Sequence, residues 1–188
     1  MIIDGECSSV DICSAPLKHL RDQEKICFES KNITEISLND ILFFDVFYFL
    51  RSSDPLNHYW FDIIKRFHKK VVCEVDDNFF ALQQECFKRY YDKPLIRSTV
   101  ANFLRNSDIV KYGSQTLLDE LDMGGNSVVL PYPAPMMPKR DTRNNYEKEY
   151  IKIVFASSKE RRDDLLFMIP AIKAILDEFS NVQFHFMG

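Results

Sequence analysis

Glycine is scarce in this chain of 188 residues, which contains only five. None of the five lies in a G-x-G-x-x-G or G-x-x-x-x-G-K-[ST] pattern. Those patterns bring the backbone close to phosphate groups in dinucleotide-binding folds and P-loop enzymes. A G-x-S-x-G elbow and an H-E-x-x-H zinc motif are also missing. The sequence therefore disfavours these nucleotide-binding classes and the hydrolases that use such motifs.

Long apolar runs and metal-type cysteine patterns are missing as well. The most hydrophobic stretch, residues 41–50, spans ten residues and contains Asp45, whereas a helix needs roughly 20 apolar residues to cross a bilayer. The first ten residues carry two acidic side chains, so no signal peptide is predicted. The cysteines form no C-x-x-C pair and no zinc-type spacing with histidine; they are Cys7, Cys13, Cys27, Cys73 and Cys86. We expect free thiols in a reducing cytoplasm, and neither a metal site nor a cofactor.

Basic charge is not in excess either. The formal net charge is -4 and the isoelectric point is about 5.6, whereas nucleic-acid-binding domains usually show a basic face. Nucleic acid is therefore not an expected partner. The hydrophobic content of 46% and the aromatic content of 13% are enough for a sizeable core.

Strands and helices are predicted to alternate along the first part of the chain. Expected strands cover residues 41–50, 71–75, 109–112 and 127–130. Expected helices cover residues 15–25, 57–70, 98–106 and 115–121. Such alternation is typical of a doubly wound parallel sheet. Residues 1–134 are therefore predicted to form a Rossmann-like α/β domain.

A second unit is expected after a connector. Prolines and a charged stretch make residues 135–150 the predicted interdomain linker. Residues 151–156, 162–179 and 181–187 then predict a strand, a helix and a parallel strand. A parallel sheet normally needs more strands than these, so 151–188 are interpreted as the incomplete start of a second Rossmann-like domain. We expect this segment to be loosely held, or to dock on the first domain, because so small a unit buries little.

The first candidate site follows the strand at residues 71–75. It delivers Asp76 and Asp77 to its carboxyl end, where ligands of open α/β sheets bind. Carboxylates there can accept hydrogen bonds from sugar hydroxyls, hold a metal or act as a base. The alternative is that these residues, with Asn78, cap a helix over residues 79–87. The two readings are compatible, because one residue can cap while its neighbour faces the cleft. A metal-dependent enzyme using Glu74 beside both aspartates is a weaker alternative.

Two further features are candidates for binding. Hydroxyls and cations precede the predicted helix at residue 162, where a helix N-terminus favours a diphosphate; they are Ser157, Ser158, Lys159, Arg161 and Arg162. A solvated charged loop is the plainer interpretation of that segment. Arg51 follows the strand that ends at Leu50 and could face the same cleft as Asp76.

Five stretches of the chain resemble, in order and spacing, the two-domain GT-B glycosyltransferases, particularly bacterial enzymes that build surface polysaccharides. They are residues 45–51 (DVFYFLR), 71–80 (VVCEVDDNFF), 107–114 (SDIVKYGS), 128–135 (VVLPYPAP) and 151–188. Each is a strand with a polar end. The resemblance implies an enzyme whose first domain binds a glycan or lipid-linked acceptor and whose second domain binds a nucleotide-sugar. It also implies a cytoplasmic location and leaves open peripheral contact with the inner face of the membrane.

The resemblance assigns roles to the candidate residues and has two departures. It implies that Lys159, Arg161 and Arg162 bind the donor diphosphate. Asp76 and Asp77 match an acidic strand end of the family to which the resemblance gives no role, and our leading hypothesis is that one of them orients the acceptor hydroxyl. The family's first βα turn usually contains glycine, and we expect this chain to begin at or after that turn. The family's acidic E-x(7)-E motif is missing, so we interpret the chain as truncated within the second domain and inactive alone. The alternative is a non-catalytic α/β module that associates through its unfinished sheet edge.

Overall fold

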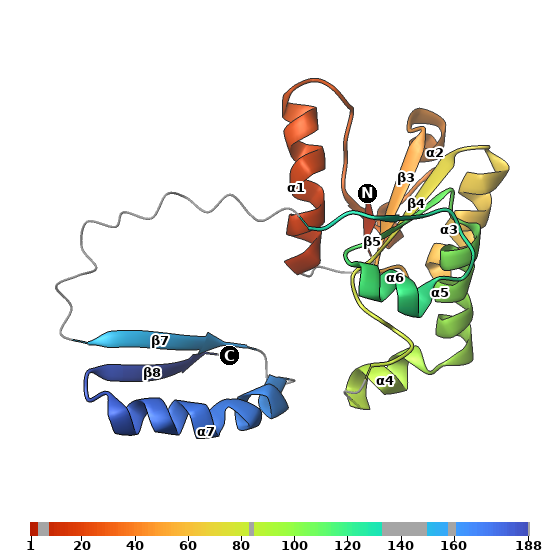
Figure 1. Ribbon diagram of the computed structural model, residues 1–188. Helices are drawn as coiled ribbons and strands as arrows, with labels where there is room; N and C mark the ends of the chain where they lie inside the picture. The colour runs from red at the N-terminus through yellow and green to blue at the C-terminus, as the bar shows by residue number, and fades with distance from the viewer. Residues whose placement is uncertain (4–7, 83–84, 133–149, 158–160, 188) are drawn as a thin grey trace. The chain divides into compact units, whose positions relative to one another are not determined.

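The computed structural model describes residues 1–3, 8–82, 85–132, 150–157 and 161–187 (Figure 1). The chain divides into two compact units, Met1–Pro135 and Met136–Gly188, and each is described by itself. The predicted linker at 135–150 lies outside the described residues except for Tyr150.

The first unit is built on a six-stranded sheet. Its strands are β1 (Ile2–Ile3), β2 (Lys31–Asn32), β3 (Val46–Leu50), β4 (Lys70–Val75), β5 (Ile109–Tyr112) and β6 (Ser127–Val129). They are ordered β2-β1-β3-β4-β5-β6, and each neighbouring pair is parallel. The chain reverses its direction of travel across the sheet between β1 and β3, which is a topological switch point. The prediction of an α/β fold with a parallel sheet is confirmed.

Helices cover the two faces of this sheet unequally. They are α1 (Ser8–Asp22), α2 (Leu38–Phe43), α3 (Pro55–Arg66), α4 (Glu85–Tyr91), α5 (Pro94–Asn106) and α6 (Gln115–Leu121), with a short 3₁₀ helix at Ile33–Glu35. Right-handed crossovers place α1, which links β1 to β2, on one face and the helices between β3 and β6 on the other. Figure 1 shows α1 on the opposite side of the sheet from α3 and α5.

The apolar core lies on the α3 and α5 face. The ring of Phe103 in α5 packs 4.8 Å from Phe49 of β3 and 4.8 Å from Phe61 of α3, between ring centroids. Alternate residues of each strand point to opposite faces. Glu74, between the core residues Cys73 and Val75, therefore faces α1.

Two predicted elements of the first unit are wrong. The predicted strand at 41–50 is helix α2 followed by β3, because Ser37 and Asp40 form a capping box that starts a helix. The predicted helix at 79–87 begins only at Glu85, as α4. Asn78 instead accepts a hydrogen bond from the backbone of Phe80, which shapes a turn.

The two shortest strands, β1 and β2, were not predicted. Strand β1 nevertheless lies inside the sheet and is followed by α1, so a βα connection precedes β2 in this chain. The connection itself, at residues 4–7, includes Gly5 and lies outside the described residues.

The second unit contains β7 (Ile151–Ala156), α7 (Arg162–Glu178) and β8 (Val182–Met187), with β7 and β8 paired in parallel in a sheet of their own. This is the strand, helix and parallel strand that the sequence predicts. Pro170 lies inside α7 without ending it. Ile172 is the only buried side chain among the described residues of this unit.

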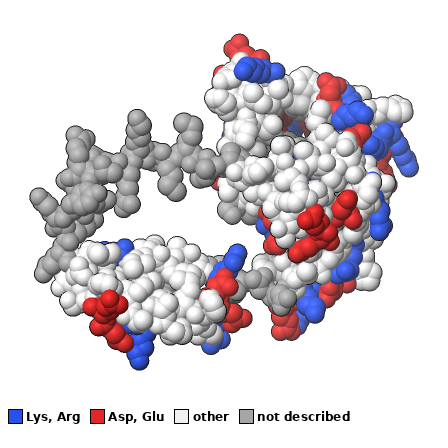
Figure 2. Space-filling model, in the orientation of Figure 1, with Lys and Arg blue, Asp and Glu red and all other residues white. Residues whose placement is uncertain are grey.

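The surface of the first unit carries charges of both signs, in line with the nearly balanced composition. Side chains of both signs are scattered over the visible face of the first unit, and neither sign dominates there (Figure 2). None of the described helices combines the length and the apolar character needed to cross a membrane.

Candidate functional site

The carboxyl edge of the first sheet brings two predicted site residues together. Arg51 follows β3 and Asp76 follows β4, and these strands are parallel neighbours. The Arg51 Nη1 donates to Asp76 Oδ2 at 3.3 Å. Ser9, in the first turn of α1, donates its Oγ to the same carboxylate oxygen at 2.5 Å. Helix α1 and the ends of strands β3 and β4 therefore meet at the Asp76 carboxylate, beside the switch point.

Arg51 adopts an unusual backbone conformation at this edge. Its φ is 55°, in the left-handed region, which costs a non-glycine residue roughly 1–2 kcal/mol. Its N–H donates to the carbonyl of Glu74 on β4 at 3.2 Å, and its guanidinium lies 5.6 Å from the centre of the Phe79 ring. Such strain persists where the surrounding structure demands it, commonly at functional sites.

Asp77 has a different role from Asp76. Its side chain accepts a hydrogen bond from the backbone of Asn78 at 2.9 Å, and Asn78 in turn donates to Glu120 of α6 at 2.8 Å. Asp77 is exposed and shapes the turn, whereas Asp76 is turned into the cluster. The structure thus separates the two aspartates that the sequence proposed together.

Glu74 and Lys111 form a buried ion pair next to Asp76. They are register partners on β4 and β5, and the Lys111 ammonium contacts one oxygen of the Glu74 carboxylate. The Glu74 side chain is 0% exposed and that of Lys111 is 15% exposed. Glu74 received little weight from the sequence because it lies inside an apolar strand. The sequence signal that could have identified this pair is one charged residue, Glu74 or Lys111, inside each of two adjacent apolar strands.

Cys13 of α1 and Tyr132 line the same cluster. Burial and then the nearby Glu74 carboxylate raise the pKa of Cys13 to about 12. Burial and Glu74 also raise the pKa of Tyr132, whose ring centre lies 4.6 Å from the Lys111 ammonium. Both the thiol and the phenol lie close enough to the Glu74 carboxylate to interact with it. Both side chains are therefore uncharged near pH 7 and line the cluster.

Gly113 allows the Tyr132 ring to take this position. A Cβ atom at Gly113 would lie 2.5 Å from a ring carbon of Tyr132. Any side chain at residue 113 would therefore displace the ring from Lys111.

Buried polar atoms without a hydrogen-bond partner gather at this edge. They are Ser52 Oγ, Glu74 Oε2, Asp76 Oδ1 and the Tyr132 hydroxyl. Buried polar groups are nearly always paired. Each carboxylate therefore has one oxygen paired with a cation and one buried oxygen without a hydrogen-bond partner.

The structure gives the metal-dependent alternative no support. Among the described residues, no three histidine, cysteine or acidic side chains are grouped to hold a metal. Glu74 and Asp76 are each paired with a cation instead.

The predicted diphosphate site in the second unit is described only in part. Ser157 continues β7, with its N–H donating to Met187 at 2.8 Å. Arg161 pairs with Asp164 at 3.0 Å on the exposed first turn of α7, and Arg162 is exposed. Ser158 and Lys159 lie outside the described residues.

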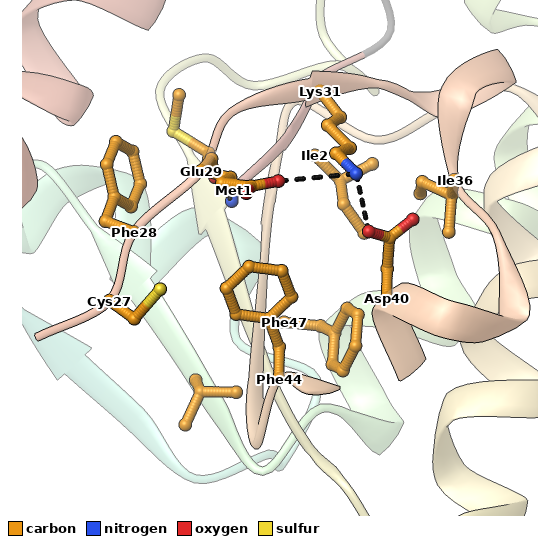
Figure 3. A pocket seen from close by; sticks show the side chains of 11 residues that line it. Met1, Ile2, Cys27, Phe28, Glu29, Lys31, Ile36, Asp40, Phe44 and Phe47 are labelled. Atoms are coloured by element: carbon orange, nitrogen blue, oxygen red, sulfur yellow. Dashed lines mark hydrogen bonds and ion pairs between the residues drawn. The ribbon is translucent and has the colours of Figure 1, made fainter. Parts of the chain in front are cut away.

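Two adjoining cavities lie at the opposite, amino-terminal edge of the first sheet. The larger, of about 420 Å³, is lined mainly by aromatic and aliphatic side chains of α1, of the segment that follows α1, and of β3 with the residues just before it. At the smaller one, Lys31 bridges Asp40 at 2.5 Å and Glu29 at 3.3 Å (Figure 3). Neither cavity is lined by a predicted site residue.

Comparison with family models, with curated proteins and with solved structures found no match to this chain. The functional assignment therefore depends on the geometry of the site and on the resemblance noted in the sequence.

Proposed function

We propose that this chain is part of a GT-B-type glycosyltransferase that transfers a sugar from a nucleotide-sugar to a hydroxyl group of a glycan or lipid-linked acceptor. The arrangement of Asp76 carries the proposal. One carboxylate oxygen is fixed by Ser9 and Arg51, and the other is buried without a partner. A carboxylate so held at the carboxyl edge of a parallel sheet can accept a hydrogen bond from an acceptor hydroxyl.

The proposed reaction divides between the two units. The acceptor oxygen forms a bond to the anomeric carbon of the donor sugar while the bond from that carbon to the diphosphate breaks. The nucleoside diphosphate leaves, and the hydroxyl proton passes through Asp76 to solvent. Arg161 and Arg162, at the positive end of the α7 dipole, would stabilise the charge on the departing diphosphate.

A titration of the isotope-labelled chain with uridine and guanosine diphosphate sugars, followed by amide NMR, tests the proposal. We expect weak binding, because the second unit offers a single strand-helix-strand, with shifted amides in the β7–α7 connection. Replacing both Arg161 and Arg162 by Ala should weaken this binding, whereas Arg105→Ala, an exposed cation of the first unit, should not. Absence of nucleotide-sugar binding, or shifts confined to the first unit, would contradict the proposal.

A second candidate function is association without catalysis. The second unit exposes large apolar side chains on α7, and Phe167 is 87% exposed. Such a surface favours contact with another protein. Light scattering over a range of concentrations tests this: association that Phe167→Ser abolishes would support it, and a monomer at every concentration would exclude self-association.

A further inference from the structure

The larger cavity at the amino-terminal edge of the first sheet lies where β1 is shorter than its neighbour β3. Only two of the five residues of β3 pair with β1, and both are at its carboxyl end. The amino-terminal half of β3 therefore has no β1 residue beside it. The cavity is lined there by Val46 and Tyr48 of β3, by Leu17 of α1 and by residues 26–28, which lead towards β2. It is a recess in the α1 face of the sheet.

The walls of this cavity are mainly aromatic. Four of the ten described residues that line it are aromatic, namely Phe28, Phe43, Phe44 and Tyr48. The rings of Phe43 and Phe44 meet edge to face, with 87° between their planes and 4.9 Å between their centroids. The volume of about 420 Å³ falls within the roughly 300–1,000 Å³ of pockets that hold small molecules, and such pockets are mostly apolar. The cavity can therefore hold the apolar body of a small ligand.

One carboxylate lies at the mouth of the cavity. Phe43 and Val46 are each more than half exposed, so the cavity opens to solvent beside them. Asp45 supplies the only charged side chain among the described lining residues. Its carboxylate is 90% exposed and contacts the Lys69 ammonium group through one oxygen, at 3.1 Å.

Further charges lie at the adjoining smaller cavity. Figure 3 shows Lys31 in contact with both Glu29 and Asp40 there. The Met1 amino group donates to the Glu29 carbonyl, and burial lowers its pKa to about 6, so it is largely uncharged at pH 7. Together with the ion pair at the mouth, three carboxylates lie beside two ammonium side chains. An anionic ligand would be repelled, and the complementary ligand is cationic.

We propose that this cavity binds a small ligand that has an apolar body and an ammonium group. The apolar body lies among Leu17 and the aromatic walls, and the ammonium group lies beside Asp45. The faces of aromatic rings attract such a cation as well. The site is independent of sugar transfer, because it lies at the opposite edge of the sheet from Asp76 and contains none of the residues assigned to that reaction.

Amide NMR titration of the 188-residue chain with 1-naphthylmethylamine and with 1-naphthylacetate tests this inference. The two probes share an aromatic body and carry opposite charges. We expect the amine to shift the amides of Cys27 and Val46 with a Kd below about 1 mM, and 1-naphthylacetate to bind at least about tenfold more weakly. The amides of Arg51 and Asp76 should not move with either probe.

Two pairs of variants separate the parts of the site. Cys27→Trp places a large ring at an exposed residue that lines both cavities and should abolish amine binding, whereas Leu95→Trp, at an exposed residue of α5, should not. Asp45→Asn should reduce the preference for the amine to less than about threefold. Asp92→Asn is the matched control, because Asp92 is also exposed and paired with a cation, Arg97, and it should keep the preference.

The thiol of Cys27 gives a measurement that needs no variant. Cys27 is exposed, whereas Cys13 and Cys73 are buried. Bound 1-naphthylmethylamine should therefore slow the alkylation of Cys27 by iodoacetamide, as measured by mass spectrometry of its peptide. The same amount of methylamine, which has no apolar body, should leave the rate unchanged.

Four outcomes would overturn the inference. They are no shift with the amine, binding of 1-naphthylacetate as tight as that of the amine, alkylation of Cys27 that the amine does not slow, and a dimer in light scattering that Cys27→Trp abolishes. The last outcome would mean that a second copy of the chain occupies the cavity. None of them bears on nucleotide-sugar binding by the second unit, so this inference and the proposed function fail separately.

Discussion

At the scale of single residues, Arg51 joins an ion pair to a left-handed backbone. Both Arg51→Ala and Arg51→Gly remove the ion pair, but only glycine relieves the backbone strain. We expect the glycine variant to be more stable than the alanine variant by roughly 0.5–1 kcal/mol, since strain relief exceeds the entropy that glycine adds to the unfolded chain. Urea unfolding of both variants measures the difference.

Arg105 supplies the control for this comparison. It lies near the end of helix α5, where glycine is normally less stable than alanine by up to about 1 kcal/mol. If the glycine variant is less stable than the alanine variant at residue 51, as is expected at residue 105, the backbone of Arg51 is not strained.

Asp108 links three parts of the first unit through its carboxylate. It accepts hydrogen bonds from Lys65 at 2.8 Å, Lys70 at 3.0 Å and the Val71 N–H at 2.9 Å. Burial alone would raise the pKa of Asp108, but these three donors outweigh it and lower the pKa below its ordinary 3.8. The carboxylate therefore stabilises the fold above pH 3.8, and this contribution is lost as the pH falls below that value.

Asp108→Asn should lower the free energy of unfolding by roughly 1–3 kcal/mol at pH 7. The gap between wild type and variant should narrow as the pH falls below about 4, because wild type then loses the same charge. Urea unfolding at pH 7 and at pH 3 measures the gap. Asp45→Asn, at a 90% exposed carboxylate paired with Lys69, should change stability by less than about 1 kcal/mol at both. If the difference in unfolding free energy between wild type and Asp108→Asn does not change with pH, the charged network around Asp108 is refuted.

At the scale of elements, helix α2 depends on its first turn. The Ser37 side chain accepts a hydrogen bond from the Asp40 N–H, and Asp40 accepts one from the Ser37 N–H. Ser37→Ala should cost about 1 kcal/mol in unfolding free energy, and Ser37→Gly only a few tenths. If thermal or urea unfolding shows the same loss of unfolding free energy in both variants, the cap does not stabilise this helix.

The same helix shows where the sequence pattern was insufficient. Apolar residues from Ile41 to Phe44 fit a buried strand as well as a helix, and periodicity alone cannot separate the two over so short a run. The serine and aspartate three residues apart, before Ile41, were the missed signal. Elements bounded by clear polar ends, such as β5 and α6, have the predicted limits. Strands β1 and β2 have two residues each and are defined by pairing with distant strands, which no local pattern reveals.

The site was predictable to the extent that it lies at strand ends. Arg51 and Asp76 directly follow strands, so sequence order alone places them at the carboxyl edge. Ser9 and Lys111 join them only through the crossover of α1 and the register of β4 with β5. Those are long-range features that a single sequence does not contain.

At the scale of the whole molecule, the two units differ in how much they bury. The first has a continuous core of aromatic and aliphatic side chains, whereas Ile172 is the only buried side chain among the described residues of the second. Few buried apolar contacts imply low local stability. Hydrogen exchange should therefore be much faster for the amides of β7 and β8 than for those of β4. Equal protection in a monomeric sample would contradict this.

The central claim is that Asp76, held by Arg51 and Ser9, presents its second carboxylate oxygen to a sugar hydroxyl. The most direct measurement is the amide spectrum of the wild-type chain and of Asp76→Asn during titration with a methyl hexopyranoside. The account predicts shifts at Arg51 and Asp76 in the wild-type chain and their near-complete loss in the variant. A sugar that leaves these amides unmoved, or that shifts them equally in both proteins, would contradict it.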